Sequence, residues 1–195
     1  MSVAAPLDPR TPVLIGCGQV AQHAAAIDDA KDPVGLMIDA LRGAASDAGL
    51  ASVPDVVDAV AVVAQLTWRY GDPAFLIAEE LGIATAHTLL TTHGGNSPQS
   101  LVNHVATKIQ HGEYDIALLA GGEATRTKAR AKKQGVELRW PKTSDDQVPE
   151  TVGEDLDMSH PAERALGVFM PVQIYPMFET AIRACLLYTS DAADE

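Results

Sequence analysis

The clearest indication of the fold is the segment LLTTHGGNSPQS, residues 89–100. Its first residues are apolar or β-branched, as in a buried strand, and they run into a tight Gly-Gly turn. Ser97 and Pro98 then begin a helix, because Ser is a preferred N-cap residue and Pro is favoured in the first helical turn. Many α/β enzymes keep a nucleophile at such a corner, yet this segment contains no cysteine.

The same alternation of strand and helix is repeated along the chain. Further strands are predicted at residues 13–15, 56–64 and 114–124, and helices at residues 32–50, 72–82 and 97–112. The strands are apolar on both faces, and helices separate them. This order predicts an α/β fold with a mainly parallel mixed sheet, helices on both faces and a long irregular loop region after the last strand.

Composition divides the chain into four parts. Residues 1–10 are rich in Pro and Ala and are predicted to be disordered, and residues 11–123 form the α/β domain. Residues 124–184, rich in charge and Pro, are predicted to form a loop or lid region. Residues 185–195, CLLYTSDAADE, resemble translated sequencing adapter and are interpreted as a non-native tail; the alternative is an amphipathic extension of the preceding helix. That helix has no Gly or Asn cap, so we expect the natural protein to continue.

The net charge and the cysteine content make several classes of binding partner and cellular location less favourable for this protein. The formal net charge of −12 disfavours binding to nucleic acid or to anionic membranes, and no apolar run is long enough for membrane insertion. The two cysteines do not form a disulfide framework, and the N-terminus does not resemble a signal peptide. A cytoplasmic protein is therefore expected.

Four short sequences together resemble the N-terminal half of the thiolase superfamily. They are GCGQ (16–19), HGGNSPQSLV (93–102), GGEA (121–124) and PVQIYPMFETAIRA (171–184). Within that superfamily the chain is most similar to acetyl-CoA acetyltransferase-like, sterol-carrier-type thiolase-like proteins. The resemblance implies a thiolase-like fold, acyl-CoA-dependent acyl transfer, and acyl-CoA or CoA as substrate or ligand without a permanently bound cofactor. The resemblance is also compatible with a homo-oligomer of the full-length protein.

The resemblance also implies a departure at the corner. In thiolases the helix after the third strand carries a nucleophilic cysteine at its N-terminus, where the helix dipole stabilises a thiolate. The corresponding position here is Gly95, with an uncertainty of one residue on either side. His93 and Asn96 are then the candidate catalytic residues, since either could hydrogen-bond a thioester oxygen. The simpler interpretations are a histidine that pins the turn and an Asn in a turn or N-cap, with Ser97 as an N-cap.

The basic run that follows residue 123 is a candidate site for the phosphates of CoA. It includes Arg126, Lys128, Arg130 and Lys132 on a predicted helix, and these cations could pair with phosphate oxygens. A solvated helix face explains the same pattern.

One competing motif remains. GCGQVA, residues 16–21, fits the dinucleotide pattern G-x-G-x-x-A and suggests an NAD(P)-binding Rossmann oxidoreductase. Against it, the next helix is predicted to begin only near residue 33, and no acidic residue ends the second strand. No metal site is expected. The functions left open are an acyltransferase, a non-catalytic acyl-CoA or lipid-thioester binding protein, and this oxidoreductase.

Overall fold

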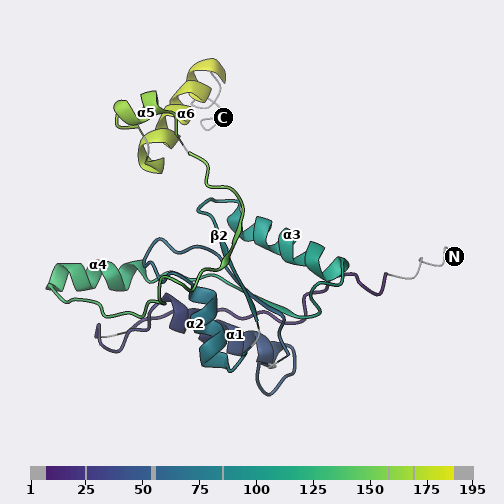
Figure 1. Ribbon diagram of the computed structural model, residues 1–195. Coiled ribbons are helices and arrows are strands. Elements are labelled where there is room, and N and C mark those ends of the chain that lie inside the picture. Colours follow the sequence, from purple (N-terminus) through teal and green to yellow (C-terminus); the bar gives the residue numbers. More distant parts are fainter. Residues whose placement is uncertain are drawn as a thin grey trace, which may run out of the picture. The chain divides into compact units, whose positions relative to one another are not determined.

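The computed structural model describes residues 8–24, 26–53, 56–84, 86–157, 159–168 and 170–186. The chain divides into two units, Met1–Glu154 and Asp155–Glu195 (Figure 1). Residues 1–7 and 187–195 lie outside the described part, so most of the predicted disordered N-terminus and most of the predicted non-native tail do as well.

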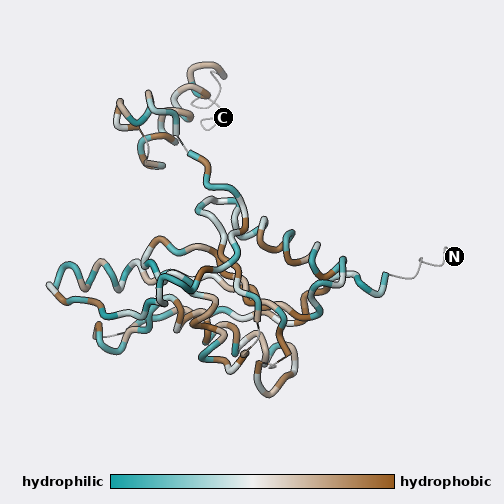
Figure 2. Tube along the Cα trace, viewed as in Figure 1, coloured by the Kyte–Doolittle hydropathy of each residue, from teal (hydrophilic) through white to brown (hydrophobic). Residues whose placement is uncertain are grey.

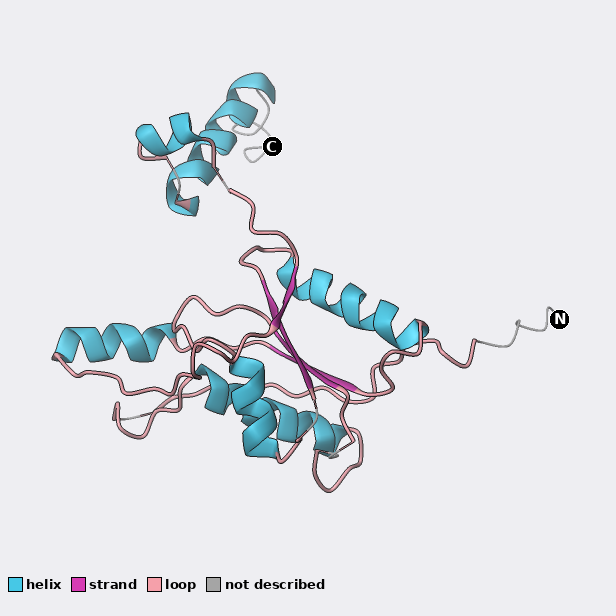
Figure 3. Cartoon of the chain, viewed as in Figure 1, coloured by secondary structure: helices cyan, strands magenta, loops and turns pink. Residues whose placement is uncertain are grey.

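A four-stranded sheet forms the centre of the first unit. Its strands are β1 (Ala59–Val62), β2 (His87–Thr91), β3 (Ala117–Ala120) and β4 (Glu150–Val152). The spatial order is β3-β1-β2-β4, and each pairing among these described strands is parallel. Figure 3 shows the strands between the helices of this unit. Ala61 pairs with both Leu89 and Leu119, which aligns the three longer strands. The predicted α/β class with a mainly parallel sheet is confirmed.

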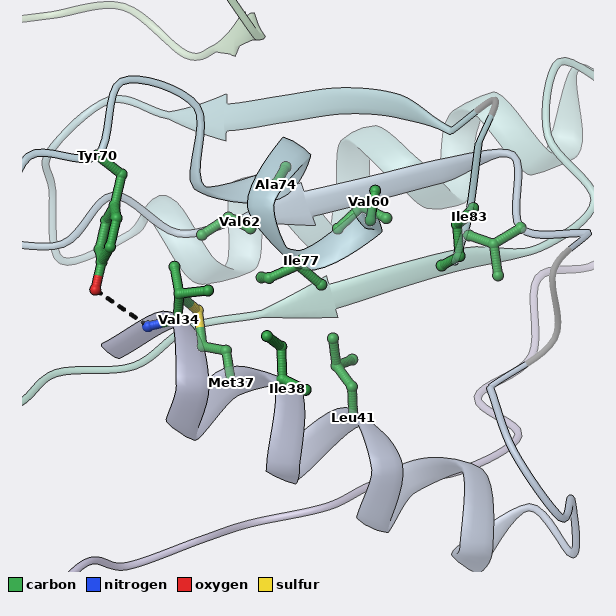
Figure 4. Close-up of a cluster of buried hydrophobic side chains, with 12 residues drawn as sticks. Val34, Met37, Ile38, Leu41, Val60, Val62, Tyr70, Ala74, Ile77 and Ile83 are labelled. Carbon is green, nitrogen blue, oxygen red and sulfur yellow. Dashed lines mark hydrogen bonds between the residues drawn. The ribbon is translucent and has the colours of Figure 1, made fainter. Parts of the chain in front are cut away.

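Helices cover both faces of this sheet. α1 (Pro33–Asp47) and α2 (Pro73–Leu81) pack on one face, and α3 (Ser97–Gln110) packs on the other (Figure 1). Successive strand side chains point to opposite faces, so β1 contributes to two cores. Val60 and Val62 pack against α1 and α2 (Figure 4), whereas Ala59 and Ala61 face α3.

Local sequence explains where α1 and α2 begin. The Asp32 carboxylate accepts a hydrogen bond from the Gly35 N–H (2.9 Å), and the Asp72 carboxylate accepts one from the Phe75 N–H (2.9 Å). In both helices Pro follows the capping Asp, where its missing N–H costs nothing. These starts agree with the sequence analysis.

The predicted strand at residues 13–15 is wrong. The segment is extended but pairs with no described strand, and Val13, Leu14 and Ile15 are 72 %, 86 % and 59 % exposed. Conversely, β4 was not predicted, because its residues lie in the charged, Pro-rich region. It forms by pairing with the open edge of β2, a contact between residues far apart in sequence.

The remaining helices are α4 (Thr125–Gln134) in the first unit and α5 (Pro161–Ala165) and α6 (Pro171–Leu186) in the second. Figure 2 shows that α4 is mostly hydrophilic, while the strands are hydrophobic. Within the described ranges, no helix is both long and apolar enough to cross a membrane. The lid role predicted for residues 124–184 stays a prediction.

Candidate functional site

The carboxyl ends of the strands are tied together at one edge of the sheet. The Ala64 N–H donates to Thr91 Oγ1 (3.0 Å), which links the end of β1 to the end of β2. The Thr92 N–H donates to the Val152 carbonyl (3.0 Å), which links β2 to β4. Open α/β sheets bind ligands at this edge, and the corner at residues 92–97 lies here.

Within that corner, Ser97 has a structural role. It is the first residue of α3 and is only 5 % exposed, and its hydroxyl donates a hydrogen bond to the Thr92 carbonyl (2.7 Å). The predicted N-cap role of Ser97 is therefore wrong. Asn96 occupies the N-cap position, but its side chain makes no cap hydrogen bond among the described residues and donates instead to Ser100 Oγ (3.2 Å).

Gly95 is an open position at the mouth of α3. A Cβ placed on Gly95 would meet no heavy atom of the described residues within 4 Å, and its φ is not in the left-handed region. A Cβ on Gly94 would lie 2.9 Å from Asn96 Oδ1 and 3.2 Å from Ser97 Oγ. A side chain would thus fit at Gly95 without any change, whereas one at Gly94 would require the Asn96 side chain to move. His93 and Asn96 are exposed beside it, so their predicted roles remain sterically possible and stay predictions.

The GGEA sequence after β3 holds this edge together. The Glu123 carboxylate accepts hydrogen bonds from the Leu66 N–H (2.5 Å), the Thr67 N–H (2.9 Å) and the Thr67 hydroxyl. A Cβ on Gly122 would lie 3.0 Å from Met37 Cγ, so glycine permits the close approach of α1. Sequence analysis did not select Glu123 as a single residue, although an acid that follows an apolar strand after two glycines was a usable signal.

Two of the four predicted phosphate-binding cations already bind the protein itself. Lys128 Nζ donates to the Thr67 carbonyl (2.6 Å), and an Arg130 guanidinium nitrogen donates to the Ala24 carbonyl (2.8 Å). Arg126 and Lys132 are exposed. At 100° per residue, Arg126 and Arg130 lie on one side of α4 and Lys128 and Lys132 on another. The CoA-phosphate role stays a prediction. Lys128 is exposed as well, but its ammonium group is engaged by the Thr67 carbonyl.

A second polar cluster, which the sequence analysis did not identify, lies at the amino end of the strands. His87 Nδ1 lies 2.7 Å from the Tyr114 hydroxyl, and the Glu150 carboxylate lies 3.4 Å from His87 Nε2 and 3.5 Å from His104 Nε2. Burial, followed by the negative charge of Glu150, raises the pKa of Tyr114. His87 opens β2 while the corner follows its other end, so this cluster is separated from Gly95 by the length of a strand.

The GCGQVA motif has a packing explanation. Residues 16–21 form no helix, so the helix that a dinucleotide fold would begin inside the motif is missing from this described segment. A Cβ on Gly16 would overlap the Ala44 carbonyl oxygen, and one on Gly18 would overlap the Ala40 carbonyl oxygen. These glycines therefore allow the segment to lie directly on α1, which favours packing over phosphate binding.

Comparison with solved structures identifies a similar fold. The chain is similar to the crystal structure of a monomeric SCP2-thiolase-like protein type 1 from Mycobacterium smegmatis, with 31% sequence identity and a TM-score of 0.51. The match covers 62% of this chain and 25% of that chain. No protein-family model and no curated protein matches the chain. Together with the parallel sheet and its two helix layers, this similarity shows that the chain has a thiolase-like fold.

Proposed function

We propose that the protein containing this chain is acyltransferase-related, binds an acyl-CoA thioester at the residue 93–97 corner, and forms no acyl-enzyme there. The observation that carries the proposal is Gly95, which leaves the mouth of α3 open and without a nucleophile. The similarity to an SCP2-thiolase-like protein supports a thioester as the ligand class.

The chemistry of the corner favours binding over covalent attack. Ser97 carries a hydroxyl in the first turn of α3, but it is buried and already donates its proton to the Thr92 carbonyl. The first N–H groups of a helix have no partner within the helix and carry partial positive charge. In α3 the Ser97 N–H donates to the Gly94 carbonyl, the Ser100 N–H donates to the Asn96 carbonyl and Pro98 has no N–H, which leaves the Gln99 N–H as the helix donor. A thioester carbonyl oxygen over Gly95 would accept from it, and His93 or Asn96 would add a side-chain donor.

The cations of α4 are the proposed binding site for the phosphates of CoA. CoA carries several phosphate charges, and the chain as a whole is acidic with a net charge of −12. α4 concentrates cations against that background, and Arg126 and Lys132 are exposed on it. We assign the phosphates to this helix.

Labelling with radioactive acetyl-CoA tests the proposal. The full chain should bind acetyl-CoA saturably in equilibrium dialysis and retain no label after denaturation, because the corner provides no nucleophile. The Gly95→Cys variant should retain acetyl label, since the side chain has room and sits at a helix N-terminus that favours the thiolate. The matched variant Gly94→Cys should retain less, because its Cβ would lie 2.9 Å from Asn96 Oδ1 and 3.2 Å from Ser97 Oγ, so these side chains would have to move out of the arrangement seen at the corner.

Three results would contradict the proposal. Covalent acetyl label on residues 93–97 of the unmodified chain would show a nucleophile that we have not identified. Equal labelling of Gly94→Cys and Gly95→Cys would show that the corner does not position the thioester. Saturable binding of NADH without binding of acetyl-CoA would favour the dinucleotide interpretation of residues 16–21.

A further inference from the structure

The short strand β4 is attached to the sheet by few contacts. It has three residues and pairs with β2 from Leu89 to Thr91. Val152 is buried in the core beside α3, whereas Thr151 is exposed. A strand of this length gains little stability from its backbone pairing alone. The remaining side chain, that of Glu150, therefore contributes much to how firmly β4 stays paired.

The Glu150 carboxylate lies between two histidines that belong to different elements. Its Oε2 lies 3.4 Å from Nε2 of His87, the first residue of β2. Its Oε1 lies 3.5 Å from Nε2 of His104 in α3. The side chains of Glu150 and His104 are partly buried, so salt and water screen their interaction less than on an open surface. One carboxylate thus connects β4 to both β2 and α3.

The distances to the two histidines suit ion pairs better than neutral hydrogen bonds. A hydrogen bond from an N–H group to an oxygen is normally about 2.7–3.2 Å long and needs good alignment. His104 Nε2 is inaccessible to solvent and has no hydrogen-bond partner within the described part of the chain. A neutral imidazole would leave this buried atom unsatisfied, whereas a protonated one is attracted by the Glu150 charge without strict alignment.

Tyr114 provides a partner for the second nitrogen of His87. The Tyr114 hydroxyl lies 2.7 Å from His87 Nδ1. A hydroxyl group can donate to an unprotonated ring nitrogen or accept from a protonated one, and both nitrogens of a charged imidazole are donors. In the charged state, Nδ1 donates to Tyr114 while Nε2 faces Glu150. The surroundings of His87 therefore accommodate a positive charge.

The other charged groups near the cluster also favour positively charged histidines. Lys108, His111 and Glu113 line an adjoining polar groove of about 520 Å³, and the Asp58 carboxylate acts on the cluster from the residue before β1. Lys108 donates to Glu113 (2.6 Å), and His111 Nδ1 lies 3.9 Å from the same carboxylate. Together with Glu150, the site has three carboxylates, Glu150, Glu113 and Asp58, against the one ammonium group of Lys108.

We propose that Glu150, His87 and His104 form a pH-sensitive latch that holds β4 on β2 and loosens as the two histidines lose their protons. Histidine ordinarily titrates between about pH 5 and 8, and glutamate is ordinarily ionised above about pH 5. Both ion pairs are therefore present near the lower end of this range and are lost towards its upper end. The proposal does not depend on the function proposed for the corner at Gly95.

Two backbone amides distinguish release of β4 from unfolding of the whole unit. The Thr92 N–H donates to the Val152 carbonyl (3.0 Å), so it is protected from exchange only while β4 is paired. The Val63 N–H donates to the Ala120 carbonyl (2.9 Å) on the other side of the sheet and serves as the internal reference. Protection of Val63 also shows that a variant is folded.

Amide hydrogen exchange of the full chain, followed by NMR and corrected for the intrinsic pH dependence of exchange, tests the latch. Protection of Thr92 should fall about tenfold between about pH 5.5 and about pH 8, while protection of Val63 should change little. Thr92 protection that is constant or rises over this range would overturn the proposal. An equal loss at Val63 would also overturn it, because the pH would then act on the whole unit.

Matched variants assign the pH dependence to the latch. Glu150→Gln keeps the size of the side chain and removes its charge, so Thr92 should show the weaker protection at both pH values. The double variant His87→Gln/His104→Gln should behave in the same way. His111→Gln is the control, because His111 is exposed and faces Glu113, and it should leave the pH dependence intact. A pH dependence that survives Glu150→Gln would refute the latch.

Discussion

The Tyr70 hydroxyl connects the loop after β1 to the start of α1. Its removal tests how much its two hydrogen bonds contribute to the free energy of unfolding. Tyr70 is 2 % exposed. Its hydroxyl donates to Asp32 Oδ2 (2.7 Å) and accepts from the Val34 N–H (3.2 Å), the second contact being drawn in Figure 4. Tyr70→Phe keeps the ring in the core and removes both hydrogen bonds.

The expected cost follows from these two contacts. A hydrogen bond to a charged carboxylate contributes about 1.5–3 kcal/mol, and a buried N–H left without a partner costs about 1–3 kcal/mol. The two terms overlap because one hydroxyl serves both groups. We therefore expect Tyr70→Phe to lower the free energy of unfolding by about 2–3 kcal/mol at neutral pH.

The pH dependence gives a second, independent readout. Burial, followed by the hydrogen bond to Asp32, raises the pKa of Tyr70 well above its ordinary value of 10.0. The folded protein then keeps a proton that the unfolded chain releases, so this stabilisation is complete below pH 10 and is lost as the pH rises further. The loss is about 1.4 kcal/mol per pH unit for one proton. Tyr70→Phe should lack this contribution and keep only the part due to Tyr114, whose pKa is also raised.

Urea unfolding followed by tryptophan fluorescence measures both effects, because Trp68 and Trp140 lie in mutual contact near this loop, with ring centroids 5.3 Å apart. Tyr175→Phe is the matched control, since Tyr175 is 65 % exposed and belongs to the second unit. A Tyr70→Phe variant that unfolds at the same urea concentration as the unmodified chain, or that loses stability equally steeply above pH 10, would refute the reasoning.

Three further outcomes are expected from unfolding measurements. Leu101→Ala should lower the free energy of unfolding by about 2–5 kcal/mol, because Leu101 is 1 % exposed between α3 and the sheet. Val102→Ala should lower it far less, because Val102 is 48 % exposed. Equal losses would contradict the packing of α3. Gly43→Ala should stabilise α1 by about 1 kcal/mol, because alanine is the better helix former and its Cβ would lie 3.7 Å from the nearest neighbouring segment. A lower melting temperature for that variant would indicate a clash. The hydrogen bond from Lys108 lowers the pKa of Glu113. The stabilisation of the folded chain by this pair is therefore present above the ordinary pKa of Glu and is lost as the pH falls through the lowered value. Glu113→Gln should remove this contribution to the pH dependence of unfolding, and salt should weaken it.

The sequence by itself determined the features that depend on neighbouring residues. Asp-Pro at residues 32–33 and 72–73 predicts the starts of α1 and α2, because a carboxylate cap and a Pro without an N–H act within one turn. Gly82, with φ +74°, ends α2 for a similarly local reason. The absence of a cysteine at the corner was also visible in the sequence, whereas the open space at Gly95 was found only in the structure.

Only the tertiary structure decided the features that join distant residues. The apolar run at residues 13–15 has the composition of a strand but no described neighbour to pair with, and β4 has a poor strand composition but lies against the open edge of β2. Likewise, the hydrogen bond from Lys128 to the Thr67 carbonyl joins residues far apart in sequence and could not be predicted from the sequence. A strand forms only when a second strand lies beside it, and a lysine side chain binds an acceptor that the fold brings near. In both cases the partner lies far away in sequence.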